Sequence, residues 1–213
     1  MTEFQKKYYE KRGQVLVKNL QSHHFEAYYC ADKAEALAKA LELIPEGSSV
    51  GWGGALSAQQ IGLIDAVNAG NYQAIDRDKA ANPAERVKLM KQCLAADVFI
   101  TGANALSMDG QMVNLDGMGN RVAAIVYGPD SVVVIAGMNK AVDTLEDAVR
   151  RVRTVAAPMN MQRFAALQTP CQVTGQCVDC KSENCICNQL LVTRNSKPAG
   201  RIKIILVGEE LGF

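Results

Sequence analysis

Along this chain, segments in which apolar residues recur at helical spacing alternate with short segments that are apolar throughout. Near residue 40, Leu37, Leu41 and Ile44 recur at helical spacing, and Asp32 stands where an N-cap residue belongs. By the same reasoning we expect helices over about residues 2–21, 32–44, 57–70, 83–96 and 143–167, the last interrupted or ended near Pro158. We expect short strands at residues 25–29, 49–54, 72–76, 97–106, 188–195 and 201–213. Repeated strand–helix–strand units predict an α/β fold with a mostly parallel sheet flanked by helices.

Three local signals refine this pattern. Ser57, followed three residues later by a glutamine, matches a capping box at the start of the third helix. The Asp109-Gly110 pair lies between short alternating segments and predicts a hairpin or a bulged strand. The apolar runs 121–128 and 131–137 predict two further strands.

Composition narrows the classes of function. The chain has 213 residues, of which 48% are hydrophobic and 21% charged, so we expect one domain over residues 1–213. Lys plus Arg total 23 against 22 for Asp plus Glu, and no strip of basic and aromatic residues is visible, which argues against nucleic-acid binding. No apolar run reaches the roughly 18 residues of a membrane span, and the charged N-terminus does not resemble a secretory signal. We therefore expect a cytoplasmic protein, and composition does not decide whether it forms a homo-oligomer.

A glycine loop is the first candidate for binding a small anion. Gly51, Gly53 and Gly54 free backbone N–H groups to surround a phosphate or carboxylate, and the helix that contains Ser57 adds its positive end. The loop lacks the lysine of a P-loop and the spacing of a dinucleotide fingerprint. A tight turn that serves helix packing is an equally acceptable interpretation.

The second candidate, residues 101–121, concentrates amide, acidic and glycine residues before an arginine. Its candidate ligand-binding residues are Asn104, Asn114, Asp116, Gly119, Asn120 and Arg121. Such residues also occur in ordinary turns, which is the other interpretation of this segment. Open α/β sheets, however, bind ligands at the carboxyl ends of their strands, where an arginine can hold a carboxylate or phosphate. On an open rim, Arg121 would contribute hydrogen bonds and little core packing. Asn139 and Lys140 follow the run 131–137, and Lys140 is either a solvated lysine or an acid–base group.

Five of the seven cysteines lie between residues 171 and 187, with the spacing C-x5-C-x2-C-x4-C-x-C. These candidate metal ligands are Cys171, Cys177, Cys180, Cys185 and Cys187. In a reducing compartment, clustered cysteines more often bind metal or carry out redox chemistry than form disulfides. Four thiolates suit a four-iron cluster or tetrahedral zinc, and the spacing matches neither a ferredoxin run nor two zinc knuckles. Redox thiols and an unligated loop are the other interpretations. The spacing leaves open whether Cys185 or Cys187 is the fourth ligand.

Three segments together carry a resemblance to a known family: GWGGALS, the stretch from TGANALS to NKAV, and RIKIILVGEELGF. They resemble the LUD domain family of lactate-utilisation proteins, over about residues 5–213. The resemblance implies a fold like that of the NagB/RpiA/CoA-transferase group, with residues 171–187 as a cysteine-rich C-terminal insertion. It also implies a link to the oxidation of lactate to pyruvate beside iron–sulfur subunits. Because of its cysteine segment, the chain departs from the plain lactate-utilisation subunit and is similar to a stand-alone, cysteine-bearing branch. We therefore expect its substrate to be lactate or a related small organic acid.

Three classes of function follow. The first is a redox accessory with a Cys-ligated iron–sulfur cluster, a rim that binds a small carboxylate or phosphate, and an iron–sulfur or other redox protein as partner. The second is an enzyme of the sugar-phosphate isomerase or CoA-transferase kind, in which Asp116 or Lys140 moves protons. The third is a ligand-binding module stabilised by zinc. We favour the first class, and the sequence alone does not assign a catalytic residue.

Overall fold

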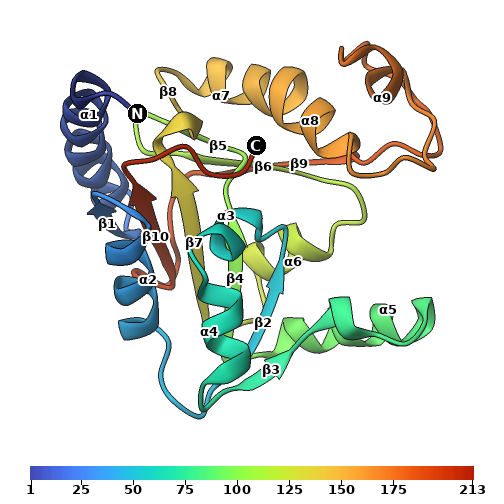
Figure 1. Cartoon of the computed structure of the whole chain (residues 1–213), viewed down its shortest axis with the longest axis horizontal. Coiled ribbons are helices and arrows are strands. Elements are labelled where there is room, and N and C mark those ends of the chain that lie inside the picture. Colours follow the sequence, from blue (N-terminus) through green and yellow to red (C-terminus); the bar gives the residue numbers. More distant parts are fainter.

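The computed structural model describes all 213 residues and contains two sheets (Figure 1). The larger sheet has six parallel strands in the order β1-β10-β7-β4-β2-β3. They are β1 (Glu26–Cys30), β2 (Ser49–Gly53), β3 (Gln73–Ile75), β4 (Val98–Gly102), β7 (Ser131–Gly137) and β10 (Ile202–Val207). The predicted α/β fold with a mostly parallel sheet flanked by helices is confirmed.

Side chains of the central strands alternate between two hydrophobic cores, one on each face of the large sheet. In β10, Ile204 and Leu206 enter the first core, whereas Ile205 and Val207 enter the second. All four are fully buried. Because both faces are covered, these strands are apolar along their whole length, which is typical of a parallel sheet.

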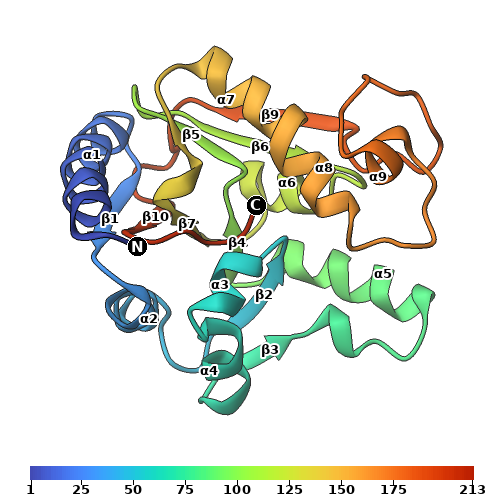
Figure 2. The ribbon, with the colours of Figure 1, turned by 45° about the horizontal axis from the view of Figure 1, so that its top comes forward.

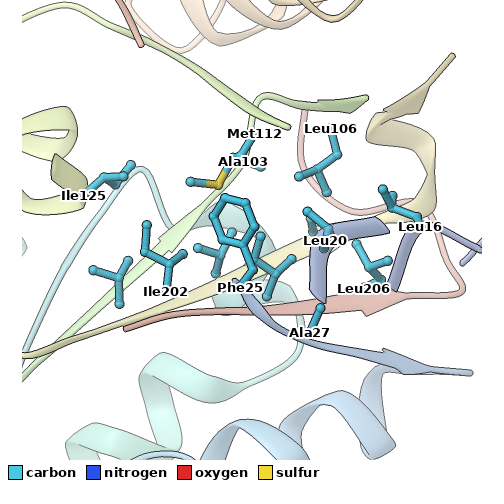
Figure 3. Packing of buried hydrophobic residues seen from close by; sticks show 14 of the residues in the cluster. Leu16, Leu20, Phe25, Ala27, Ala103, Leu106, Met112, Ile125, Ile202 and Leu206 are labelled. Atoms are coloured by element: carbon cyan, nitrogen blue, oxygen red, sulfur yellow. The ribbon is translucent and has the colours of Figure 1, made fainter. Parts of the chain in front are cut away.

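The first core lies under α1 (Glu3–Ser22) and α6 (Asn120–Val126). Figure 3 shows Leu16 and Leu20, one turn apart on α1, close to Leu206 of the sheet, with Phe25 deeper in the cluster. The short helices α5 (Pro83–Gln92) and η2 (Cys93–Ala95) lead from β3 to β4, and Cys93 joins this core. A lone helical cysteine therefore serves as a small hydrophobic side chain here.

The second core lies under α2 (Lys33–Glu42), α3 (Leu56–Gln60) and α4 (Leu63–Ala69). Asp32 accepts hydrogen bonds from the backbone N–H groups of the first turn of α2, as predicted for an N-cap. The single helix expected over residues 57–70 is divided into α3 and α4. No helix of the protein combines the length and apolar character needed to span a bilayer.

A smaller, four-stranded sheet covers part of the first core (Figure 2). Its order is β8-β5-β6-β9, with β5 (Ala105–Ser107), β6 (Met112–Asp116), β8 (Ala141–Val142) and β9 (Gln189–Thr193). The antiparallel β5–β6 pair confirms the hairpin predicted at Asp109-Gly110.

One continuous helical segment packs on the small sheet. It consists of α7 (Leu145–Arg151), the π-helix η4 (Val152–Ala156) and α8 (Ala157–Met161). The helix passes through Pro158, and the wider π turns come immediately before that residue. After α8, the chain forms α9 (Pro170–Thr174) and then the rest of the cysteine segment, which has no helix or strand before β9.

Two predicted elements were wrong. Residues 121–128 form α6 and its C-cap instead of a strand, because Gly119 turns the chain with φ +86° and the Asp116 carboxylate accepts hydrogen bonds from the N–H groups of Arg121 and Val122. The capping box at Ser57 is absent: Ala55 is the N-cap of α3, and no side chain caps that helix. The hydroxyl of Ser57 is used elsewhere, as described below.

Candidate functional site

The loops after β2 and β4 leave the large sheet toward opposite faces. After β2 the chain enters α3, whose Ala58 lies in the second core, whereas after β4 it passes Ala103 and Leu106 of the first core. Because β2 and β4 are neighbours, their carboxyl ends form a switch point of the sheet topology, the place where open α/β sheets bind ligands. We call this place the anion crevice, and most of the candidate residues gather there.

Lys140 is buried in the anion crevice. It lies in η3 (Met138–Lys140), directly after β7, and is only 4% exposed, so a solvated lysine is excluded. Its Nζ donates a hydrogen bond to the buried Oγ of Ser57 at 3.0 Å. Burial, followed by the charges of Arg151 and Arg121, lowers the pKa of Lys140 to about 7. At neutral pH this amine can therefore both take up and release a proton.

Arg121 is buried as well, at 7% exposure, and does not lie on an open rim. Its Nη2 donates to Asn104 Oδ1 at 2.9 Å and to the Leu115 carbonyl at 2.5 Å. Gly54, with φ +60°, packs against the guanidinium: a Cβ there would lie 2.8 Å from both Cδ and Nη1 of Arg121. Burial lowers the pKa of Arg121, while the Asp116 charge acts in the opposite direction. Arg121 thus contributes packing as well as charge.

Asp116 shapes the turn that carries Arg121. One carboxylate oxygen accepts from the backbone N–H of Arg121 at 3.0 Å and of Val122 at 3.2 Å. The other oxygen accepts from the N–H of Gly117 at 3.0 Å. Since these three donors occupy the carboxylate, its geometry fits a positioning role better than the proton transfer suggested by the sequence.

Asn114 lies fully buried on β6 and is only half satisfied. Its Nδ2 donates to the Gly102 carbonyl at 2.9 Å, whereas its Oδ1 has no hydrogen-bond donor. Gly102 lies against the crevice, because a Cβ on it would be 3.2 Å from the Gly54 carbonyl and 3.8 Å from Ser57 Oγ. A buried acceptor without a donor is rare, and this one borders the crevice.

Two arginines of the site were not predicted from the sequence. Arg77, in η1 (Arg77–Lys79) just after β3, lies beside Gly53, and its buried Nε has no partner. Arg151, on α7, donates from Nη1 to the Asn104 carbonyl at 2.6 Å. Arg77 follows a predicted strand, so the rule that ligands gather at strand carboxyl ends could have found it. No local signal marks Arg151, which reaches the crevice from a distant helix.

Four cations therefore share the anion crevice, and we call them the cation cluster: Arg77, Arg121, Lys140 and Arg151. None of them forms a salt bridge; the nine salt bridges of the protein involve other residues. Burial is the largest cause of a lowered pKa in all four. Arg121 and Lys140 are buried and Arg77 and Arg151 are half-buried, so gathering these cations without a salt bridge costs free energy that a bound anion would offset.

The last residues of the chain cross this crevice. The N–H of Gly212 donates to Gln60 Oε1 at 2.7 Å, and that of Leu211 donates to Asn139 Oδ1 at 3.1 Å. A Cβ on Gly212 would lie 3.0 Å from Lys140 Nζ. Figure 2 accordingly shows this segment near α3 and above β4. It covers Lys140 directly.

The cysteine segment forms a second feature, beside the small sheet. A cavity of about 510 Å³, which we call the cysteine cavity, is lined by four of its five cysteines: Cys177, Cys180, Cys185 and Cys187. The Sγ atoms of Cys185 and Cys187 are 3.0 Å apart. No three ligating side chains converge on a point that would hold a single metal ion.

The family model for the LUD domain matches residues 13–207. The chain belongs to the LUD domain family. At the level of the family, it is thus a lactate-utilisation-type protein. A comparison with curated proteins finds no match.

Two solved structures are similar to this LUD chain. A DUF162 family protein from Deinococcus radiodurans is 12% identical, with 93% of this chain and 98% of that chain covered and a TM-score of 0.55. Ribose 5 phosphate isomerase A from Neisseria gonorrhoeae is 20% identical, with 53% and 54% covered and a TM-score of 0.34. Only the first TM-score is high enough to indicate a shared fold.

The LUD structure brings together most of the residues singled out from the sequence, but not all. Those in or against the anion crevice are Gly53, Gly54, Ser57, Asn104, Asn114, Asp116, Arg121 and Lys140. Gly51 instead packs on Cys93, where a Cβ would lie 2.6 Å from the Sγ. Gly119 and Asn120 begin α6, and Asn139 holds the C-terminal segment. These four residues support the site without contributing to the cation cluster.

Proposed function

We propose that this LUD protein binds a small hydroxy acid, lactate or a relative of it, in the anion crevice and takes part in its oxidation as a redox accessory. The observation that carries the proposal is the cation cluster, which has no salt bridge and contains the buried Arg121 and Lys140, beside the unsatisfied Oδ1 of Asn114. The electrons would leave through a metal centre at the cysteine segment, toward an iron–sulfur or other redox partner protein.

The cation cluster supports an anionic ligand. A carboxylate that entered the crevice would accept charge-assisted hydrogen bonds from Arg121 or Arg151, which are shorter and stronger than neutral ones. It would also neutralise charge in a place that water reaches poorly, where electrostatic attraction is strongest. A neutral ligand would leave the cations unpaired.

Asn114 supports a hydroxyl group on that ligand. Its Nδ2 is committed to the Gly102 carbonyl, which fixes the orientation of the amide, so the free atom is an acceptor. A simple carboxylate offers no donor to this atom, whereas a hydroxy acid offers its O–H. The N–H donors of the cation cluster and the acceptor Oδ1 of Asn114 together match a hydroxy acid better than a plain carboxylate.

Lys140 supports proton transfer during the oxidation. With a pKa of about 7, a large fraction of the amine is neutral at physiological pH and can accept the proton of the substrate hydroxyl when that O–H turns from Asn114 Oδ1 toward the amine. Ser57, at 3.0 Å, holds the amine in place. The oxidation also breaks the Cα–H bond of the hydroxy acid and releases two electrons. We assign this second proton and both electrons to the redox partner protein as the final acceptor, and the metal centre at the cysteine segment would pass the electrons on one at a time.

The test is calorimetric titration of the protein with lactate, propionate and ribose 5-phosphate. Lactate should bind more tightly than propionate, which lacks the hydroxyl, and Asn114→Leu should remove that difference. Arg151→Met should weaken lactate binding about tenfold or more, since a hydrogen bond to a charged group contributes about 1.5–3 kcal/mol.

Arg201→Met is the matched control. Arg201 is also half-buried and also donates to backbone carbonyls, but it precedes β10, at the opposite end of the sheet. Lactate affinity should be unchanged in this variant. Equal binding of lactate and propionate would contradict the hydroxy-acid proposal. Tight binding of ribose 5-phosphate alone would favour an enzyme of the isomerase kind.

A further inference from the structure

We infer that Cys177, Cys180, Cys185 and Cys187 together ligate one four-iron, four-sulfide cluster in the cysteine cavity, and that Cys171 is not a ligand. This inference rests on the metal centre of the proposed function and specifies its ligands and its type. It also removes the choice between Cys185 and Cys187, because both line the same cavity.

Cys171 is set apart from the other four thiols. It lies in the short helix α9, where its Sγ is 3.4 Å from Thr169 Oγ1 and its carbonyl accepts from Gln162 Nε2 at 3.0 Å. It contributes nothing to the lining of the cysteine cavity. The chain after α9 has no helix or strand before β9, so the remaining four cysteines are not held apart by regular structure.

The arrangement of the four thiols favours a cluster over a single ion. Zinc needs all four sulfurs at about 2.3 Å from one point, and no three ligating groups converge in that way. In a four-iron cluster, each cysteine binds a different iron, so the sulfurs surround a volume instead of a point. A cavity of about 510 Å³ is far larger than one ion requires. The sulfurs of Cys185 and Cys187 are 3.0 Å apart, so the inference requires that they separate when each loses its proton and binds its own iron.

The walls of the cavity suit a negatively charged cluster. Leu115 and Val149 form an apolar side of the cavity, and Leu190, which is 47% exposed, lies at its edge. Lys181 and Arg153 also line the cavity; Arg153 forms an ion pair with Asp179 of the same wall, so Lys181 is the cation that opposes the net negative charge that four thiolates give to a cluster. Burial and charge of this kind are what tune the potential of such a centre.

The cavity also touches the turn that builds the anion crevice. Asn188, on the cavity wall, donates its backbone N–H to the Asp116 carbonyl at 2.8 Å and its Nδ2 to the carbonyls of Gly117 and Cys185 at 3.1 Å. The carboxylate of the same Asp116 positions the backbone of Arg121. A cluster in this cavity is therefore linked to the cation cluster through one turn of chain, which gives electrons a short path between them.

The experiment compares five single variants, Cys171→Ser, Cys177→Ser, Cys180→Ser, Cys185→Ser and Cys187→Ser, with the wild type. Each protein is purified anaerobically, supplied with iron and sulfide, and analysed for iron, sulfide and zinc, for its visible absorption spectrum, and for electron paramagnetic resonance after reduction. Wild type and Cys171→Ser should each hold about four iron and four sulfide per chain. The other four variants should lose most of this iron and the spectrum. Circular dichroism checks that every variant is folded.

Several results would overturn the inference: loss of the cluster in Cys171→Ser, full retention in any of the other four variants, one zinc in place of iron, or no metal after reconstitution. Lactate titration of the same samples separates this question from the proposed function. A cluster in a protein that binds no hydroxy acid would leave the ligand assignment standing and refute the crevice proposal. Lactate binding by a protein that holds no cluster would refute the ligand assignment and leave the crevice proposal standing.

Discussion

Replacement of Lys140 by methionine should stabilise the folded protein, although it removes a side chain from the anion crevice. Methionine has a similar length and carries no charge, so it fills the same space among the buried residues. The wild-type amine is only 4% exposed and has two arginines as its charged neighbours and no acidic partner. The folded state therefore disfavours the protonated form of Lys140, and the unfolded state does not.

The size of the effect follows from the pKa. A decrease from 10.5 to about 7 corresponds to about 5 kcal/mol, at about 1.4 kcal/mol for each pKa unit. Below pH 7 Lys140 is protonated in both the folded and the unfolded state, so the folded state carries the whole free-energy cost of burying the charge. Between pH 7 and pH 10.5 only the unfolded state keeps the proton, so the free energy of unfolding of the wild type rises with pH. Above pH 10.5 the cost is gone. The lost hydrogen bond to Ser57 subtracts about 1 kcal/mol from the gain.

Urea unfolding between pH 6 and pH 10 measures this difference, with fluorescence of the single, buried Trp52 as the signal. Lys140→Met should be more stable than the wild type by about 4 kcal/mol at pH 6, and the difference should shrink steadily as the pH rises toward 10. Lys203→Met is the control, because Lys203 has an acidic partner, Glu26, at 2.9 Å. An equal difference at pH 6 and pH 10, or a less stable Lys140→Met at pH 6, would refute the reasoning.

Two further predictions concern the residues that shape the crevice. Gly54→Ala should be less stable than Gly47→Ala by about 1–3 kcal/mol in urea unfolding, since both glycines have positive φ but only at Gly54 does a Cβ meet Arg121; equal losses would contradict the close packing. Asp116→Ala and Asp32→Ala should each lower the free energy of unfolding by about 1–2 kcal/mol, because each carboxylate accepts hydrogen bonds from two backbone N–H groups at the start of a helix. Only Asp116→Ala should also weaken lactate binding in calorimetry, and a similar weakening in Asp32→Ala would assign the effect to stability alone.

The sequence predicted an element correctly where the residues of that element alone fix its conformation. The cap at Asp32 and the helical spacing of the residues after it predict α2, and the apolar run of 131–137 predicts β7. The run 121–128 failed because a buried helix and a buried strand can share one apolar pattern. What decides between them is the carboxylate of Asp116, which comes from the preceding strand and caps the helix.

In the candidate site, too, some residues were predicted from the sequence and others were located only by the structure. The rule that ligands gather at strand carboxyl ends found Lys140, Arg121 and Asn114. It could not find Arg151, which comes from a helix packed on the other sheet, nor the separation of Cys171 from the remaining cysteines. Ser57 was found, but its hydroxyl was assigned to a cap instead of to Lys140.

The sequence by itself thus determined most of the succession of strands and helices, the parallel sheet and the ends of the strands at which polar residues collect, because these depend on periodicity and on short-range hydrogen bonds. Only the tertiary structure decided which of those residues are buried, which cations lie together without acidic partners, and which thiols surround one cavity. Burial and proximity arise when elements distant in the chain pack together, and those two quantities set the charge, the pKa and the ligand preference of a site.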